Sequence, residues 1–117
     1  MSLFERSGFE RSLMQLPGVS FADQWEARVA KVGGKVFCLL SDRQPLRIVF
    51  KCGEDSFDIL TALEGIGQPP YFAKRHWVEV QQGAPLSEEE LRAYIGRSHA
   101  LVATRLTRKL RTELGIG

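Results

Sequence analysis

Apolar residues near the N-terminus recur at helical spacing, at positions Phe9, Leu13 and Leu16. Ser2 and Glu5 have the spacing of a capping box, which satisfies the first free N–H groups of a helix. Pro17-Gly18 then interrupts the pattern, as such a pair does at a helix end. The first predicted element is therefore a helix that begins beside Ser2 and ends before Pro17.

Two β-rich segments, residues 25–32 and 35–40, come next and are separated only by Gly33-Gly34. A type I′ turn requires positive φ at both central residues, so this pattern predicts a β-hairpin. A third strand is predicted over residues 46–52, whose apolar face is formed by Leu46, Ile48, Phe50 and Cys52. The opposite face carries Arg47, Val49 and Lys51 and is expected to be partly in contact with water.

The middle of the chain predicts one more helix and one more strand. The helix is expected to begin at residues 54–56, with Asp55 or Ser56 as its cap and Gly65 just after its end. Residues 76–81 predict a strand, which residues 71–74 either extend or pair with.

A second capping-box pattern, formed by Ser87 and Glu90, predicts the start of the last helical segment. Gly96 weakens that helix, and Ser98 has the chemistry to cap a new one after it. The element order is then α-β-β-β-α-β-α, with an additional short strand near Tyr71. Antiparallel hairpins flanked by helices predict a single α+β domain over residues 1–117.

Composition places the chain among ordinary globular proteins. Of its 117 residues, 44% are apolar and 26% are charged, so a packed core is expected rather than disorder. No apolar run reaches the ~18–20 residues of a membrane span, and the N-terminus lacks a signal-peptide pattern, so we expect a cytoplasmic protein. Cys38 and Cys52 are expected to be buried free thiols, the alternative being a redox or metal pair.

Sequence motifs for catalysis and for cofactor binding are missing from the chain. It contains no phosphate-binding glycine loop, no nucleophile elbow and no zinc-protease signature. His76 and His99 are 23 residues apart, with no cysteine or aspartate at ligand spacing, so neither a metal nor another cofactor is expected. We predict no catalytic residues and a protein that is not an enzyme.

Positive charge is concentrated near the C-terminus. Residues 1–87 contain ten basic and ten acidic side chains, whereas residues 91–112 contain six basic side chains and no acidic one. On a helical wheel one arc is apolar and contains Leu91, Ile95, Val102, Leu106 and Leu110, with His99 at its centre as an expected core histidine. The opposite arc contains Tyr94, Leu101, Arg97, Arg105, Arg108 and Arg111.

Two interpretations of this basic arc stay open. Arginine forks match phosphate geometry, so the arc and Lys109 predict contact with a polyanion, and an exposed Tyr94 would stack on a base. Alternatively, acids at the start of a helix and bases at its end complement the macrodipole, and the charges keep the outer face solvated. Other cations would widen a binding surface if they were adjacent, namely Lys35, Lys51, Lys74 and Arg75.

Short motifs occur in a fixed order along the chain: Leu16-Pro17-Gly18, Val32-Gly33-Gly34-Lys35-Val36-Phe37, Phe50-Lys51-Cys52, Gly65-Ile66, Arg75-His76-Trp77-Val78 and Ser98-His99 followed by Leu101-Val102. This ordered set, over about residues 9–112, is similar to the YjbR/MmcQ family of small bacterial proteins. The resemblance implies an α+β domain with an antiparallel sheet, akin to secretion-chaperone-like and double-wing folds. It also implies DNA binding, and it supplies no catalytic residues.

Together these observations predict a non-enzymatic bacterial module that binds DNA through a basic C-terminal helix and a face of the sheet. One alternative is a protein-interaction or dimerisation module, which would expose apolar surface around Tyr94 and Leu101 or on the open sheet face. A second alternative is a binder of a small molecule of unknown class.

Overall fold

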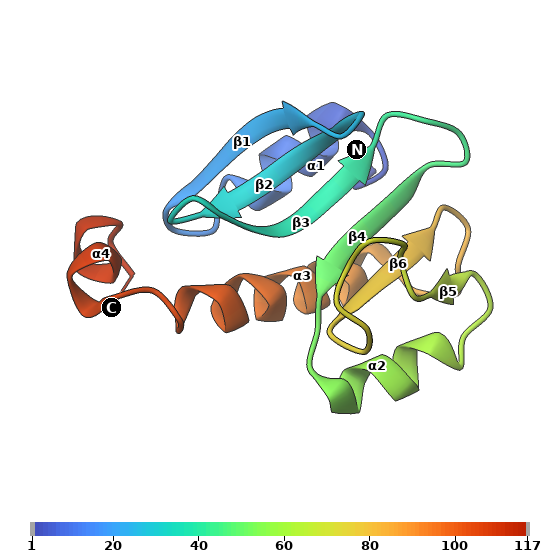
Figure 1. Cartoon of the computed structure of the whole chain (residues 1–117). Helices are drawn as coiled ribbons and strands as arrows, with labels where there is room; N and C mark the ends of the chain where they lie inside the picture. The colour runs from blue at the N-terminus through green and yellow to red at the C-terminus, as the bar shows by residue number, and fades with distance from the viewer. Residues whose placement is uncertain (1, 117) are drawn as a thin grey trace.

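The computed structural model describes residues 2–116, which form one antiparallel sheet and four helices (Figure 1). The strands are β1 (Val19–Gln24), β2 (Ala27–Val32), β3 (Lys35–Ser41), β4 (Arg47–Lys51), β5 (Ile66–Gly67) and β6 (Trp77–Gln81). They lie in the order β1-β2-β3-β4-β6-β5. The helices are α1 (Arg6–Leu13), α2 (Glu54–Thr61), α3 (Glu88–Ala103) and α4 (Arg108–Glu113). The predicted α+β class is confirmed.

The main hydrophobic core lies between one face of the sheet and the helices. It contains Phe9 of α1, Phe37 and Phe50 of the sheet, and Leu91 and Ile95 of α3, all buried. Figure 1 shows α1 and α3 on the same side of the sheet, with the loop between β5 and β6 crossing the opposite side. This second face, called the open face below, has a smaller buried cluster of Ala27, Val29, Leu39 and Val49. The predicted alternation along β4 is confirmed.

Two tight turns connect the first three strands. The predicted hairpin at Gly33-Gly34 is confirmed, with φ of 59° and 80° at the two glycines. A second turn, Trp25-Glu26, joins β1 to β2 and also has positive φ at both positions, 55° and 57°. Because neither residue is glycine, no sequence pattern indicates this turn. Strand β1 was therefore not predicted, and β2 begins at Ala27 instead of residue 25.

Two helix starts differ from the prediction. α1 begins at Arg6 because residues 3 and 4 form a turn, in which the Ser2 hydroxyl accepts from the Phe4 N–H at 3.0 Å. Only half of the first capping box forms, with the Ser2 N–H donating to Glu5 Oε1 at 3.0 Å. α2 is capped by Gly53, which has an extended backbone, so Asp55 lies inside the first turn.

The loop before β6 also differs from the prediction. Residues 71–74 form no strand, and the extra pairing to β6 comes from β5 instead. Tyr71 has a φ of 69°, a left-handed conformation that cannot continue a strand. A short strand is thus present, but it lies before the Pro69-Pro70 pair rather than after it.

The C-terminal segment is two helices rather than one. The capping box of Ser87 and Glu90 is confirmed, and α3 continues through Gly96 to Ala103 without a break. The restart comes at Thr107, whose side chain accepts from the Leu110 N–H at 3.1 Å. The prediction that Ser98 caps the new helix is therefore wrong. A single wheel over residues 91–112 does not describe the segment, because α4 has its own axis (Figure 1). Along residues 2–116, no helix is long and apolar enough to cross a membrane.

Candidate nucleic-acid interface

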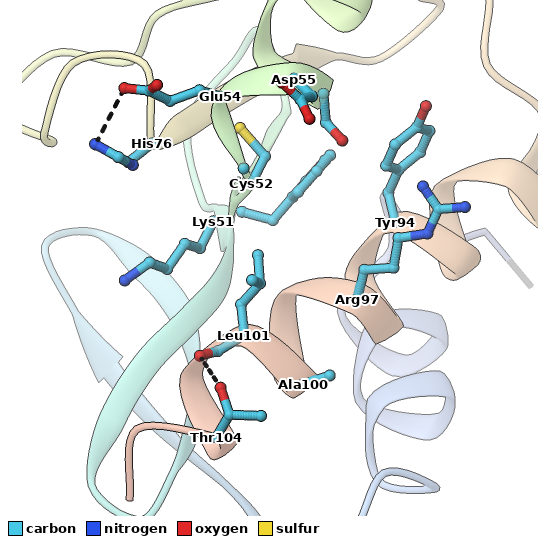
Figure 2. Close-up of a pocket in the computed structure, with 13 residues that line it drawn as sticks. Lys51, Cys52, Glu54, Asp55, His76, Tyr94, Arg97, Ala100, Leu101 and Thr104 are labelled. Carbon is cyan, nitrogen blue, oxygen red and sulfur yellow. Dashed lines mark hydrogen bonds and ion pairs between the residues drawn. The ribbon is translucent and has the colours of Figure 1, made fainter.

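A cleft lies where the end of β4 and the start of α2 face one side of α3 (Figure 2). It has a volume of about 730 Å³, and we call it the α2–α3 cleft. Its walls include Phe50, Lys51, Cys52, Glu54, Asp55, His76, Tyr94, Arg97, Ala100, Leu101 and Thr104. It brings Arg97 of the predicted basic arc close to the end of the third predicted strand.

Within this cleft, the Tyr94 ring is already engaged in contacts with other side chains of the protein. The ring stacks on Phe50, with a centroid separation of 6.0 Å and an interplanar angle of 25°. The Arg97 guanidinium lies over the same ring, 5.2 Å from its centroid. Tyr94 is therefore not the free stacking platform that the sequence suggested.

The charges of the α2–α3 cleft are mixed. Glu54 and Asp55 occupy the first turn of α2, where negative charge is favoured by the helix dipole. The Glu54 carboxylate lies 3.9 Å from His76 Nε2. Cys52 is buried, and burial raises the pKa of its thiol to about 11, so it is protonated and unreactive at neutral pH. The cleft therefore has neither an activated nucleophile nor a uniformly positive lining.

Ser98 fixes the position of the end of β4. Its hydroxyl accepts from the Lys51 N–H at 2.9 Å and donates to the Phe37 carbonyl at 2.7 Å. Extending the β3–β4 register by one residue places Phe37 opposite Lys51, but the two are not paired directly. The buried hydroxyl of α3 thus bridges two strands that have begun to separate. This role of Ser98 was not apparent from the sequence.

Three cations from distant parts of the chain gather beside this point. They are Lys35 at the start of β3, Lys51 at the end of β4 and Arg105 just after α3, and we call them the basic cluster. Burial lowers the pKa of Lys51, and the positive charges of Arg105 and Lys35 lower it further. Figure 2 shows the Lys51 amine pointing away from Arg97, so Arg97 borders the cleft on another side.

Most arginines in the first part of the chain have acidic partners. Arg6 contacts Asp23 at 2.9 Å, Arg28 contacts Glu10 at 2.9 Å, and Arg47 contacts Glu79 at 3.2 Å. Within residues 2–116, by contrast, no ion pair involves the C-terminal cations Arg97, Arg105, Arg108, Lys109 and Arg111, nor Lys35 and Lys51. Most of the cations from which the sequence predicted the binding surface are thus unpaired, and Arg75 is the exception.

The remaining predicted residues differ in exposure and in pairing. Arg108 and Lys109 are exposed in the first turn of α4, whereas Arg111 is half-buried in its last turn, with its Nε unpaired. Arg75 is neutralised by Asp58 at 2.8 Å, and its guanidinium lies 5.3 Å from the ring centroid of Phe57. Lys74 is exposed in the loop before β6.

His99 has a structural environment, as the apolar arc predicted. It is 5% exposed, its Nε2 lies 2.8 Å from the Pro17 carbonyl, and Phe37 contacts its ring edge-to-face at 5.3 Å between centroids. Cys38 is fully buried, and burial raises the pKa of its thiol. Along the described chain, no three His, Cys, Asp or Glu side chains gather as a metal site would require.

The fold and these contacts define a small α+β protein with a cleft of mixed charge between α2 and α3 and a cluster of unpaired cations beside it. Residues 14–101 match the model of the YjbR family, and the chain belongs to that family. Its fold is similar to that of protein DR2400 of Deinococcus radiodurans, which has the DUF419 domain. That structure is 24% identical, with a TM-score of 0.84, over 95% of this chain and 88% of the other.

A second similar structure is a protein from Pseudomonas syringae, 20% identical with a TM-score of 0.70. The alignment covers 83% of this chain and 97% of that one. No curated protein matches the chain. The comparisons therefore establish family and fold.

Proposed function

We propose that this protein is a non-enzymatic module that binds nucleic acid through its phosphates. The binding surface is the basic cluster of Lys35, Lys51 and Arg105, with Arg97 at the rim of the α2–α3 cleft and the exposed cations Arg108 and Lys109 of α4 adding charge. This surface is narrower than the sequence predicted, because Arg75 is neutralised by Asp58.

The observation that carries the proposal is the crowding of like charge around Lys51. Burial lowers the pKa of Lys51 and the positive charges of Arg105 and Lys35 lower it further, and in residues 2–116 no acidic side chain pairs with any of the three. Such crowding is unfavourable in the free protein, and a bound phosphate would relieve it. Each phosphate neutralised also releases condensed counterions, which favours binding at low salt.

The macrodipole interpretation accounts for this arrangement less well. It explains basic residues in the last turn of a helix, whereas α3 has none in its last turn. Arg105 lies in the connection after α3, and the two lysines come from strands. Their convergence is a tertiary feature, which the dipole of one helix does not produce.

Fluorescence anisotropy with a labelled oligonucleotide at two salt concentrations, about 50 mM and about 200 mM, tests the proposal. We expect Arg105→Ala to weaken binding by about three- to tenfold at the lower salt. We also expect it to reduce the slope of log K against log salt by about 0.9 for duplex DNA, equivalent to one phosphate. Arg92→Ala is the matched control, since it removes the same charge from an exposed position near the start of α3.

The control variant should bind within about twofold of the wild type, a difference of ~0.4 kcal/mol. If the wild type binds neither duplex nor single strand at the lower salt, the proposal is wrong. It is also wrong if Arg92→Ala and Arg105→Ala have equal effects, because the charge is then diffuse and the basic cluster is not a site.

A further inference from the structure

A second hollow lies on the open face of the sheet, away from the α2–α3 cleft. It has a volume of about 620 Å³, and we call it the open-face groove. Ala27, Leu39 and Val49 form an apolar floor, and the Trp25-Glu26 turn and the loop before β6 contribute aromatic side chains. The aromatic residues lining it are Trp25, Tyr71 and Phe72.

Two of these aromatic rings are exposed to an unusual degree. Trp25 is 67% exposed and Tyr71 is fully exposed. Both have left-handed backbones, with φ of 55° and 69°, which are disfavoured for large L-residues. Because both side chains are exposed, they contribute little to the packing of the core, although their backbone conformations are unfavourable. Exposed faces of this kind suit stacking against a planar ligand.

The groove also contains a pair of groups that can donate and accept hydrogen bonds. Arg47 Nη1 lies 3.2 Å from Glu79 Oε1, and both residues line the groove. The buried Arg47 Nε has no hydrogen-bond partner. Ser41 adds a hydroxyl to the same wall. A nucleobase presents both donors and acceptors on its edge, so this wall matches the edge as the aromatic rings match its faces.

The open-face groove and the basic cluster share strand β4. Arg47, Val49 and Lys51 alternate with core residues and so project from the same face. Lys51 lies four residue steps along the strand from Arg47, a distance of ~13 Å, the length of a few nucleotides. An extended single strand could therefore follow β4, with a phosphate at Lys51 and a base in the open-face groove.

We infer that the open-face groove binds an unpaired nucleobase, so that the nucleic acid this protein prefers is single-stranded. The inference rests on the proposed function for its phosphate contacts, whereas the groove itself needs only the base. In a duplex the faces of the bases are stacked and their pairing edges are occupied. A groove that stacks on a face and contacts an edge is therefore accessible to a single strand only.

Anisotropy with a single-stranded oligonucleotide and the duplex of the same sequence tests this inference. We expect the wild type to bind the single strand at least fivefold more tightly. The double variant Trp25→Ala/Tyr71→Ala should weaken single-strand binding by about tenfold or more, because it removes the two exposed rings on which a base would stack. It should leave duplex binding within about twofold, ~0.4 kcal/mol. Ile59→Ala is the matched control, because Ile59 is 64% exposed on α2, outside the groove.

A nucleoside without phosphate separates the two proposals. Adenosine at millimolar concentration should shift the Trp25 indole N–H resonance in the wild type, and the shift should persist in Arg105→Ala. If Arg105→Ala loses oligonucleotide binding and Trp25→Ala/Tyr71→Ala does not, the proposed phosphate surface is supported and the inference that the open-face groove binds a base is wrong. Equal affinity for single strand and duplex would overturn it as well, as would binding of a proline-rich peptide in the groove without any response to adenosine.

Discussion

Ser98→Ala should destabilise the protein far more than the loss of one hydroxyl from a helix normally does. The Ser98 side chain is 0% exposed and forms two hydrogen bonds to the backbone of the sheet, at 2.9 Å to Lys51 N and 2.7 Å to Phe37 O. Alanine would leave one donor and one acceptor unsatisfied in a buried position. Each such group costs about 1–3 kcal/mol, so we expect the free energy of unfolding to fall by about 2–4 kcal/mol.

Urea denaturation followed by far-UV circular dichroism measures this change. With a slope of about 1.5 kcal/mol per molar urea, the midpoint should fall by roughly 1.3–2.7 M, while the slope stays constant. Thr104→Ala, at the C-cap of the same helix, is the control, since its exposed hydroxyl donates only to the Leu101 carbonyl at 3.0 Å. That control should cost less than about 0.5 kcal/mol.

A Ser98→Ala variant as stable as Thr104→Ala would refute this reasoning. It would mean that β3 and β4 can move together until the Lys51 N–H donates directly to the Phe37 carbonyl. The Ser98 hydroxyl would then not be needed to satisfy these two backbone groups. Amide exchange distinguishes the two cases, because the Lys51 N–H should exchange faster in the variant only if it is left without an acceptor.

Two more predictions concern the hairpin glycines and the buried thiols. Gly33→Ala should destabilise the protein by about 2 kcal/mol or more in the same urea assay. Its φ is +59°, and a Cβ there would lie 2.7 Å from a Leu106 methyl; Gly34→Ala, with nothing within 4 Å, should show only the backbone cost of about 1 kcal/mol. Because burial raises the pKa of Cys52 to about 11, the native state retains a proton that the unfolded chain loses near pH 8.5. Stability should therefore fall as pH rises from about 8.5 towards 11, and a chromogenic thiol reagent at pH ~8 should label neither cysteine until urea is added.

The parts of the fold that the sequence predicted are those encoded by local rules. Gly33-Gly34 can hardly form anything but a tight turn between two β-rich segments, and the capping box of Ser87 and Glu90 marks a helix start. The Trp25-Glu26 turn escaped prediction because its residues adopt positive φ against their intrinsic preference. Ser2-Glu5 was misleading for the opposite reason. Here the sequence pattern is present and one of the two capping-box hydrogen bonds forms, from the Ser2 N–H to Glu5, but the helix begins only at Arg6.

The candidate site depended on tertiary contacts that periodicity does not report. The wheel correctly placed Leu91, Ile95 and Val102 in the core, yet it assumed that the helix axis continues through residues 104–107. Charge alone did not separate Arg75, which Asp58 neutralises, from Arg105, which has no acidic partner within residues 2–116. Pairing of charges across distant segments is decided by the fold, so a sequence could identify the cations but not the subset that acts together.

The stability of the sheet and the proposed function meet at the end of β4. Beyond the Cys38–Phe50 pair the strands β3 and β4 separate, and the Ser98 hydroxyl occupies the gap from the core side. Lys35 and Lys51 lie at this end of the two strands, and Arg105 follows from the helix that supplies Ser98. Like charges would drive this end apart if it were held by side chains alone. A buried bridge to two backbone groups holds this end without using the cations, which leaves all three without an intramolecular role that would compete with the proposed phosphate contacts.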